Sequence, residues 1–297
     1  MFSWLELMRL SNAPTVASNV LAGVAVGMLA RLSGINPPLD TMGMLLLGVL
    51  LVYAAGMMLN DACDVSTDRV ERPGRPIPSG RIPRKLARNT AVVMLAAGTT
   101  VLVFAGEKTL PWALLLGSAV LLYDTLHRQI PLSWLLLALC RGTVIVVSAL
   151  AVSPGSDWPV INLVGGGLFL YVAALSAAAR DEMRGMGKAA LVGTLAVPLL
   201  TLWPAALLLL DIPRPDNLSL AAGLGVLGGI ALPSAVLGTR NALMGRQGVP
   251  AAVGLWLGTI PVMDAAVCFL LGQPWLGVAC LGLWGAAGAL RPRIAAS

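Results

Sequence analysis

The sequence is poor in charged residues. Only 11% of its 297 residues are charged, whereas ordinary soluble domains carry about 25%. Hydrophobic residues make up 57% of the chain and its mean hydropathy is +0.84, which argues against a soluble fold. Aromatic residues are also few, at 5%, while glycine and proline number 33 and 20. This balance favours closely packed, kinked membrane helices over a barrel with aromatic girdles.

Cysteine and histidine are scarce as well. The four cysteines, Cys63, Cys140, Cys268 and Cys280, lie in or beside apolar runs without C-x-x-C spacing. Neither a disulfide framework nor a zinc site is therefore indicated, and packing roles are expected. His127 is the single histidine, and a lone histidine on a loop is more often an ordinary surface residue than a catalyst.

Apolar runs fill most of the chain. A helix that crosses the hydrocarbon core needs about 20 apolar residues. Runs of suitable composition lie near 13–31, 42–60, 89–106, 110–124, 132–152, 160–179, 189–210, 218–237, 250–272 and 275–290. Tight connections at 106–111 and 272–274 favour helical hairpins, although the final pair can also form one broken helix. We therefore predict an all-α integral membrane protein, a bundle of nine or ten transmembrane helices.

Signals for processing or for a second domain are lacking. The first apolar run follows Arg9 and shows no convincing small-residue cleavage site, so it is expected to be a retained span rather than a signal peptide. The longest non-apolar stretch, near 61–88, is too short for a domain of its own. Residues 1–297 are therefore expected to form one membrane domain.

Basic residues are unevenly distributed between the two sides of this arrangement. One side keeps Arg31, Lys108 and Arg214. The other side carries Arg9, the group from Arg69 to Arg88, Arg128, Arg180, Arg184, Lys188, Arg240, Arg246, Arg291 and Arg293. By the positive-inside rule this second side is cytoplasmic, so we predict a protein of the cytoplasmic (inner) membrane with its active site on the cytoplasmic side. The net charge of +6 follows from this bias and needs no nucleic-acid partner.

The second apolar run ends in a cluster of carboxylates. Asn60 is followed by Asp61, Asp64 and Asp68, a spacing that places the three carboxylates within an arc of about 60° on one helical face. Their mutual repulsion is offset when a divalent cation lies between them, and Mg²⁺ is typically held by one or two carboxylates plus phosphate oxygens. We therefore predict that Asp61, Asp64 and Asp68 are metal ligands and catalytic residues and that Asn60 contacts the substrate.

A basic loop, VERPGRPIPSGRIPRK, follows immediately. Guanidinium groups suit bidentate phosphate contacts, and four prolines stiffen the segment. An acidic metal site beside such a loop is what ionisation of a diphosphate leaving group requires, because negative charge grows on the departing phosphate. Arg72 and Arg75 are predicted to bind this group, the alternative being a solvated loop that obeys the positive-inside rule.

The segments NDACDVSTD and RPGRPIPSG together resemble the first signature of the UbiA family of membrane prenyltransferases. That signature is N-D-x-x-D-x-x-x-D followed by a basic R-P-x-x-S-G segment. The resemblance implies nine transmembrane helices around a central cavity that opens toward the cytoplasmic side. It also implies transfer of an isoprenoid chain from a prenyl diphosphate donor to an acceptor, with Mg²⁺ as cofactor.

The family's second aspartate-rich motif is irregular here. Family members carry D-x-x-D-x-x-x-D or D-x-x-G-D after the sixth span, where it holds a second Mg²⁺. The corresponding loop reads SAAARDEMRGMGK, in which Asp181 and Glu182 are adjacent rather than spaced along one face. We predict that Asp181 is catalytic and binds metal, and that Glu182 and Lys188 contact the substrate. A salt-bridge network within the loop is the alternative.

The third cytoplasmic loop, LYDTLHRQIP, is similar to the family's tyrosine followed by a basic pair. Tyr123 is expected to stabilise an allylic carbocation through its ring face or phenol oxygen. Arg128 is expected to bind substrate. Asp124 either positions the acceptor or pairs with Arg128.

Polar residues also occur near the amino terminus and deep in the apolar runs. LMRLSNAPT resembles the family's polar approach to the first span, so Asn12 is predicted to contribute with Arg9 to the acceptor side of the pocket. Helix-end capping is an equal alternative for this segment. Arg141 and Asp264 lie deep in two spans. We expect these two charges to pair with each other across the bundle, in preference to contacting the substrate.

Three functions are compatible with these patterns. The first is Mg²⁺-dependent prenyl transfer to a small aromatic or lipid acceptor within the membrane, with Asp124, Glu182 or water as general base. The second is a non-catalytic protein of the same fold that binds or transports a polyprenyl lipid or prenylated metabolite, motivated by the irregular second motif. Alcohol phosphotransfer between lipids ranks last, because its D-G-x-x-A-R segment is missing. The donor's chain length and the acceptor stay open.

Overall fold

The computed structural model describes residues 2–29, 39–127, 129–130, 132–180 and 187–290. Regular structure in these ranges is helical throughout, which confirms the predicted all-α class. Seven helical segments are long and apolar enough to cross a membrane: Leu10–Leu29, Leu39–Cys63, Arg84–Val103, Trp134–Val152, Trp158–Ala179, Asn217–Leu243 and Val249–Leu270.

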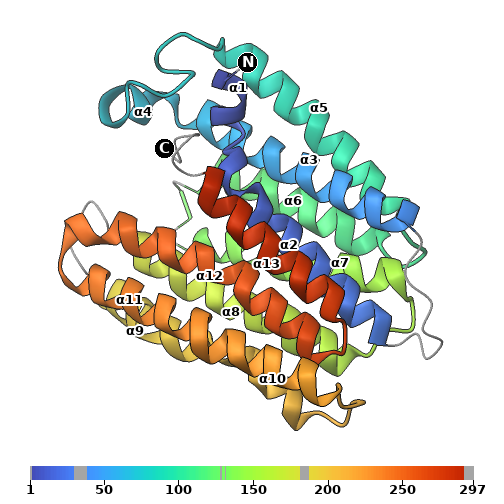
Figure 1. Ribbon diagram of the computed structural model, residues 1–297. Coiled ribbons are helices and arrows are strands. Elements are labelled where there is room, and N and C mark those ends of the chain that lie inside the picture. Colours follow the sequence, from blue (N-terminus) through green and yellow to red (C-terminus); the bar gives the residue numbers. More distant parts are fainter. Residues whose placement is uncertain (1, 30–38, 128, 131, 181–186, 291–297) are drawn as a thin grey trace.

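The remaining apolar helices complete the bundle (Figure 1). A further candidate span consists of α9 (Lys188–Leu200) and η2 (Trp203–Leu209), which are bent by 47° relative to each other. Two shorter apolar helices are α6 (Leu110–Leu126) and α13 (Pro274–Leu290). This set agrees with the predicted bundle of nine or ten transmembrane helices.

The elements that form the long spans are α2 (Ala13–Leu29), α3 (Leu39–Cys63), α5 (Arg84–Val103), α7 (Trp134–Val152), α8 (Trp158–Arg180), α10 (Asn217–Val226), α11 (Leu232–Leu243) and α12 (Val249–Leu270). Short elements are α1 (Phe2–Leu7), η1 (Leu10–Asn12), α4 (Val65–Glu71), η3 (Leu227–Ala231) and η4 (Arg246–Gly248). The α10–α11 span contains a π-helical turn, η3, directly before Pro233. Proline has no N–H for the regular ladder, which accounts for the irregular turn.

Helix α2 is the centre of the bundle. It packs against α3, α7, α12 and α13 (Figure 1), and every residue from Ala13 to Gly27 is buried. Glycines allow its close approach to α7, since a Cβ added at Gly23 would lie 2.6 Å from Ser148 Cβ and 2.8 Å from the Ile145 carbonyl oxygen. Small residues at such crossings are the usual means of tight packing between membrane helices.

Two expected hairpins are formed. Helix α5 packs against α6, and α12 packs against α13. The turn between α12 and α13 uses Gly272 at φ 71°, a left-handed conformation that glycine adopts without steric cost. The final two apolar runs are therefore separate helices, and the alternative of one broken helix is wrong.

The two deep charges meet through an amide rather than directly. Arg141 Nη1 donates to Asn19 Oδ1 at 2.7 Å, and Asn19 Nδ2 donates to Asp264 Oδ2 at 2.7 Å. Arg141 also donates to the Thr15 carbonyl and hydroxyl oxygens, while Ser18 Oγ donates to Asp264 at 2.6 Å. The expectation of a direct Arg141–Asp264 pair is corrected: α2 supplies the bridge between α7 and α12.

A small separate core supports the polar end of the bundle. Leu7 from α1, Met58 from α3, Val65 from α4 and Ala87 from α5 are buried together with Ile77 of the basic loop. In Figure 1, α1 and α4 lie at the same end of the molecule as the start of α5. This core fixes the loop between α4 and α5 against the end of α3, where the aspartate motif lies.

Candidate functional site

The aspartate motif straddles a break between two helices. Asn60 and Asp61 lie in the last turn of α3, whereas Asp68 lies in α4. Asp64 stands between them at φ −87° and ψ 3°, in the bridge region of backbone space. The motif is therefore not one continuous helical face, and the expectation of a common 60° arc is wrong. The break directs the carboxylates to two different sets of partners.

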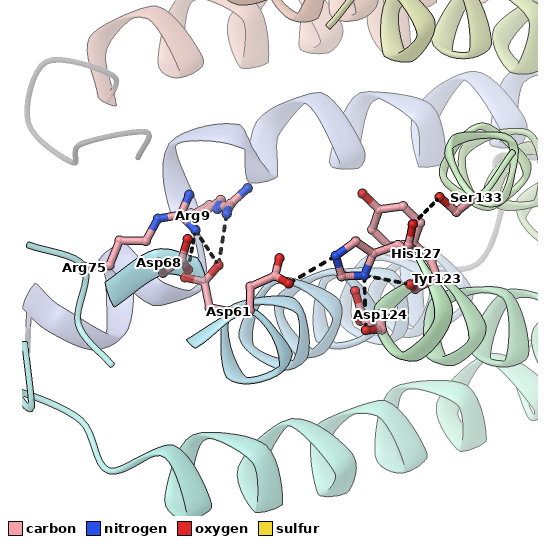
Figure 2. A network of polar contacts seen from close by, with 9 residues as sticks. Arg9, Asp61, Asp68, Arg75, Tyr123, Asp124, His127 and Ser133 are labelled. Atoms are coloured by element: carbon pink, nitrogen blue, oxygen red, sulfur yellow. Dashed lines mark hydrogen bonds and ion pairs between the residues drawn. The ribbon is translucent and has the colours of Figure 1, made fainter. Parts of the chain in front are cut away.

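Asp61 and Asp68 converge on one arginine (Figure 2). Arg75 Nη1 lies 2.8 Å from Asp68 Oδ2 and 3.4 Å from Asp61 Oδ1. Arg9 adds a second contact to Asp61, with Nη2 at 3.0 Å from Oδ1. Asp61, Asp68 and Arg75 are all buried, so these charges depend on one another for compensation.

Arg9 is held in an unusual backbone conformation. Its φ of 47° and ψ of 49° are left-handed, which is costly for a residue with a Cβ and often accompanies a functional site. The carbonyl oxygen of Arg9 accepts a hydrogen bond from the Tyr53 hydroxyl at 2.9 Å. This bond helps to hold the guanidinium over Asp61.

Asp64 contacts His127, the only histidine of the chain; His127 lies beside Tyr123 and Asp124 (Figure 2). His127 Nε2 lies 3.1 Å from Asp64 Oδ1. The other ring nitrogen, Nδ1, lies 3.2 Å and 3.3 Å from the carbonyl oxygens of Tyr123 and Asp124. The imidazole also stacks on the Tyr123 ring, with centroids 5.4 Å apart. The expectation that His127 is an ordinary surface residue is corrected, because it joins the end of α6 to the aspartate motif.

The Y-x-x-x-H spacing could have revealed this link. Residues Tyr123 and His127 are four apart at the end of an apolar run, and side chains at that separation share one helical face. If Tyr123 faces the substrate, as predicted, His127 is therefore expected to face the same side. What the sequence did not indicate was that Asp64 would lie opposite this face.

Asp124 is the second carboxylate at this end of α6. It is only 2% exposed, and the Asn60 amide lies close to it. The Oδ2 atom is buried and has no hydrogen-bond partner among the described residues. Asn60 thus connects the aspartate motif to Asp124, rather than acting only as a neighbour of the metal ligands.

A cavity of about 200 Å³ lies beside these groups, between α2, α3, α6, α7, α8 and α12. Its polar lining consists of Arg9, Asn12, Tyr53, Tyr123, Asp124, Arg141 and Ser176. The rest is largely apolar, including Val49, Leu116, Val144, Leu175 and Ile260. A space with charge on part of its wall and aliphatic side chains elsewhere suits an amphiphilic ligand.

The predicted site residues fall into three groups. Asn12, Asn60, Asp61, Asp64, Asp68, Arg75 and Tyr123 line the cavity or join its polar cluster. Arg72 and Lys188 are exposed; the backbone N–H of Arg72 caps α4 by donating to the Asp68 carbonyl. Arg128, Asp181 and Glu182 lie outside the described residues. Their predicted roles remain predictions.

The arrangement of Asp61 and Asp68 fits a cation. A single guanidinium nitrogen already contacts one oxygen of each carboxylate, so the two side chains converge on one positive group. Within the described ranges, no group of three or more His, Cys, Asp and Glu side chains is placed to hold a metal ion. Two carboxylates with phosphate oxygens are nevertheless a sufficient donor set for Mg²⁺.

A sequence model of the UbiA prenyltransferase family matches residues 20–291. Digeranylgeranylglyceryl phosphate synthase from Pyrococcus abyssi (strain GE5 / Orsay) is 36% identical over 131 residues, covering 43% of this chain and 45% of that protein. The chain spans about half the length of the curated relatives it matches.

Solved structures share the fold. A UbiA homologue from Aeropyrum pernix K1, in its apo form, has a TM-score of 0.64 at 20% identity, covering 85% of this chain and 96% of that one. A UbiA homologue from Archaeoglobus fulgidus, bound to GPP and Mg²⁺, has a TM-score of 0.56 at 15% identity, covering 88% and 99%. At these identities the likeness establishes the arrangement of helices.

Proposed function

Because the chain belongs to the UbiA prenyltransferase family, we propose that it transfers an isoprenoid chain from an allylic prenyl diphosphate to a small acceptor within the membrane. The observation that carries the proposal is the cluster of Asp61, Asp68, Arg9 and Arg75 beside a largely apolar cavity. The cluster suits a diphosphate and its counter-ion, and the cavity suits an isoprenoid chain.

Asp61 and Asp68, with Asp64 beside them, are the residues proposed to hold Mg²⁺. When bound, the ion neutralises the charge that develops on a diphosphate leaving group. The UbiA homologue from Archaeoglobus fulgidus was solved with GPP and Mg²⁺, which supports Mg²⁺ as the ion. Asp181 is a further predicted ligand.

The arginines of the cluster have a proposed second role. Arg75 and Arg9 are tied to carboxylates in the ligand-free protein, and a cation bound at Asp61 and Asp68 would compete for the same oxygens. Guanidinium groups released in this way are well suited to bind phosphate oxygens. Arg72, exposed at the end of α4, and Lys188 are proposed to approach the same group from solvent.

The cavity wall is proposed to protect the reacting carbon. Tyr123 lines the cavity, and the face of an aromatic ring attracts a cation. The aliphatic side chains around it leave few places for water, which limits hydrolysis of an allylic cation. Asn12, at the start of α2, is proposed to contact the acceptor.

The acceptor, the location and the extent of the domain are also proposals. The curated relatives carry the name digeranylgeranylglyceryl phosphate synthase, so a geranylgeranylglyceryl phosphate is proposed as the first acceptor to assay, with geranylgeranyl diphosphate as donor. Aromatic acceptors are the alternatives. We propose, from the bias of basic residues, that the active site lies on the cytoplasmic side of the inner membrane. Residues 1–297 are proposed to act as one domain.

The decisive experiment measures Mg²⁺-dependent release of pyrophosphate from geranyl, farnesyl and geranylgeranyl diphosphates by the purified protein, with a panel of lipid and aromatic acceptors. The Asp64→Asn variant is expected to reduce release by about 100-fold or more, since electrostatic stabilisation of the leaving group is lost. Asp211→Asn, which changes an exposed carboxylate between η2 and α10, is the matched control and should behave as wild type.

The outcomes separate the two candidate functions. Release that requires Mg²⁺ and disappears in Asp64→Asn supports prenyl transfer. Tight binding of the diphosphates without turnover under every acceptor would favour the non-catalytic lipid-binding alternative. Release that is indifferent to EDTA and to Asp64→Asn would refute the proposed site.

A further inference from the structure

We propose that Asp124 binds the hydroxyl group of the acceptor and removes its proton during transfer. This inference rests on the proposed prenyl transfer and names the class of acceptor: a molecule whose attacking atom is a hydroxyl oxygen. The general base, open between Asp124, Glu182 and water from the sequence alone, is thereby assigned to a residue on the cavity wall.

The environment of Asp124 carries the inference. The side chain is 2% exposed, lines the cavity, and presents an Oδ2 atom without a hydrogen-bond partner among the described residues. The Asn60 amide lies close to the same carboxyl group and leaves Oδ2 without a hydrogen-bond partner in the described part of the chain. A buried carboxylate oxygen without a donor is unfavourable, and a ligand hydroxyl would supply the missing donor.

The backbone beside this oxygen leaves room for a ligand. Gly56 of α3 lines the same cavity. A Cβ added there would lie 3.8 Å from Asp124 Oδ2 and 3.0 Å from Val120 Cγ1. The absence of a side chain at this position therefore keeps one approach to Oδ2 open. A methyl group at Gly56 would narrow that approach without changing any charge.

A structural role accounts less well for Asp124 than for Asp264, which is also deeply buried. Ser18 and Asn19 both donate to Asp264 Oδ2, at 2.6 Å and 2.7 Å. Asp264 is absent from the described lining of the cavity, and its bonds join α12 to α2 as a structural link would. Each of the two aspartates has one oxygen without a hydrogen-bond partner among the described residues, Asp124 Oδ2 and Asp264 Oδ1. Of the two residues, only Asp124 lines the cavity, where a ligand can reach it.

The chemistry balances without a further reagent. The bond between C1 of the prenyl group and the bridging diphosphate oxygen breaks, and its electron pair leaves with the diphosphate. A lone pair of the acceptor hydroxyl oxygen forms the new C1–O bond. The hydroxyl proton moves to Asp124 Oδ2, and release of this proton to the departing diphosphate or to water returns the carboxylate. A positioned base of this kind contributes about 100-fold to 10,000-fold in rate.

The experiment separates ionisation from capture. Geranylgeranyl diphosphate labelled with ¹⁸O at the bridging position is incubated with the full-length protein, Mg²⁺ and geranylgeranylglyceryl phosphate. Movement of the label to non-bridging positions reports ionisation and return, while the ether product reports transfer. Asp124→Asn should lower transfer by about 100-fold or more while label movement persists within a few-fold of wild type. Asp64→Asn should lose both.

Further variants test position and charge separately. Asp124→Glu should recover part of the transfer rate, because it keeps the carboxylate. Gly56→Ala should raise the KM for the acceptor several-fold with little change in label movement. An acceptor methylated at its hydroxyl group should not be prenylated.

Two results would overturn the inference. One is an Asp124→Asn protein that transfers at the wild-type rate. The other is a folded Asp124→Asn protein in which label movement and transfer fall in parallel, which would place Asp124 in ionisation. A wild-type protein that shows neither reaction would instead refute the proposed function, and the base assignment with it.

Discussion

Arg75 is expected to be the main stabilising residue of the ligand-free aspartate cluster. Its guanidinium contacts Asp68 at 2.8 Å and Asp61 at 3.4 Å, and all three side chains are at most 6% exposed. Replacing Arg75 with Gln removes this charge while keeping a polar side chain. Asp68 then loses the ion pair formed with Arg75, whereas Asp61 keeps Arg9 at 3.0 Å.

The size of the effect follows from this burial. Removing one partner of a buried ion pair costs about 3–5 kcal/mol. Because Asp61 keeps a partner, the lower end, about 3 kcal/mol, is expected. At about 2 °C per kcal/mol for a chain of this size, Tm should fall by roughly 6 °C. The double variant Arg75→Gln with Asp68→Asn should recover most of this loss, since the uncompensated charge leaves with its partner.

Thermal unfolding in detergent, with and without Mg²⁺, measures these effects. Mg²⁺ should stabilise Arg75→Gln more than wild type, because the Arg75 guanidinium no longer competes for the two carboxylates and only Arg9 still contacts Asp61; at 100 times Kd the gain is about 2.7 kcal/mol. Arg81→Gln is the matched control. Its pair with Glu6 is more exposed, at 42% and 20%, and should contribute less than about 1 kcal/mol. Equal Tm values for Arg75→Gln and Arg81→Gln would refute the reasoning.

Two further predictions concern packing and the histidine. Gly23→Ala should lower the free energy of unfolding by about 1–3 kcal/mol, because its Cβ would lie 2.6 Å from Ser148 Cβ. Gly43→Ala, with open space around its Cβ, is the control and should not change it. Thermal unfolding measures both variants, and equal Tm values would contradict the close approach of α2 and α7. His127→Gln should reduce pyrophosphate release about 10-fold or more, since Asp64 loses its orienting contact. Thr125→Val, an exposed change on the same helix, is its control, and unchanged release in His127→Gln would exclude an orienting role.

Much of the fold could be predicted because membrane helices leave a strong signal in composition. Runs of apolar residues identified the spans, and the turns near Gly106 and Gly272 identified the hairpins. The bend between α9 and η2 could not be predicted, since hydropathy does not show where the axis of an apolar helix changes direction. The bridge from Arg141 through Asn19 to Asp264 was also missed, because hydropathy ranks an amide among ordinary polar residues and does not show which helix it faces.

The site was predictable in identity but not in arrangement. Spacing indicated a cluster of Asp61, Asp64 and Asp68, yet it assumed an unbroken helix, whereas the chain turns at Asp64. The contact of Asp64 with His127 joins residues 63 positions apart in sequence, and no local pattern relates them. Pairing of this kind depends on how α3 and α6 pack, which is a tertiary property.

The bridge between α7, α2 and α12 also bears on how the protein is made. An aspartate at the centre of an isolated helix costs about 2.5–3.5 kcal/mol during insertion, and Asp264 lies in the buried second half of α12. The groups that offset this cost, Ser18 and Asn19, are translated 246 and 245 residues earlier. Helix α2 is therefore synthesised before α12 and supplies the polar groups that Asp264 needs. Stable insertion of α12 is thus coupled to its packing against α2.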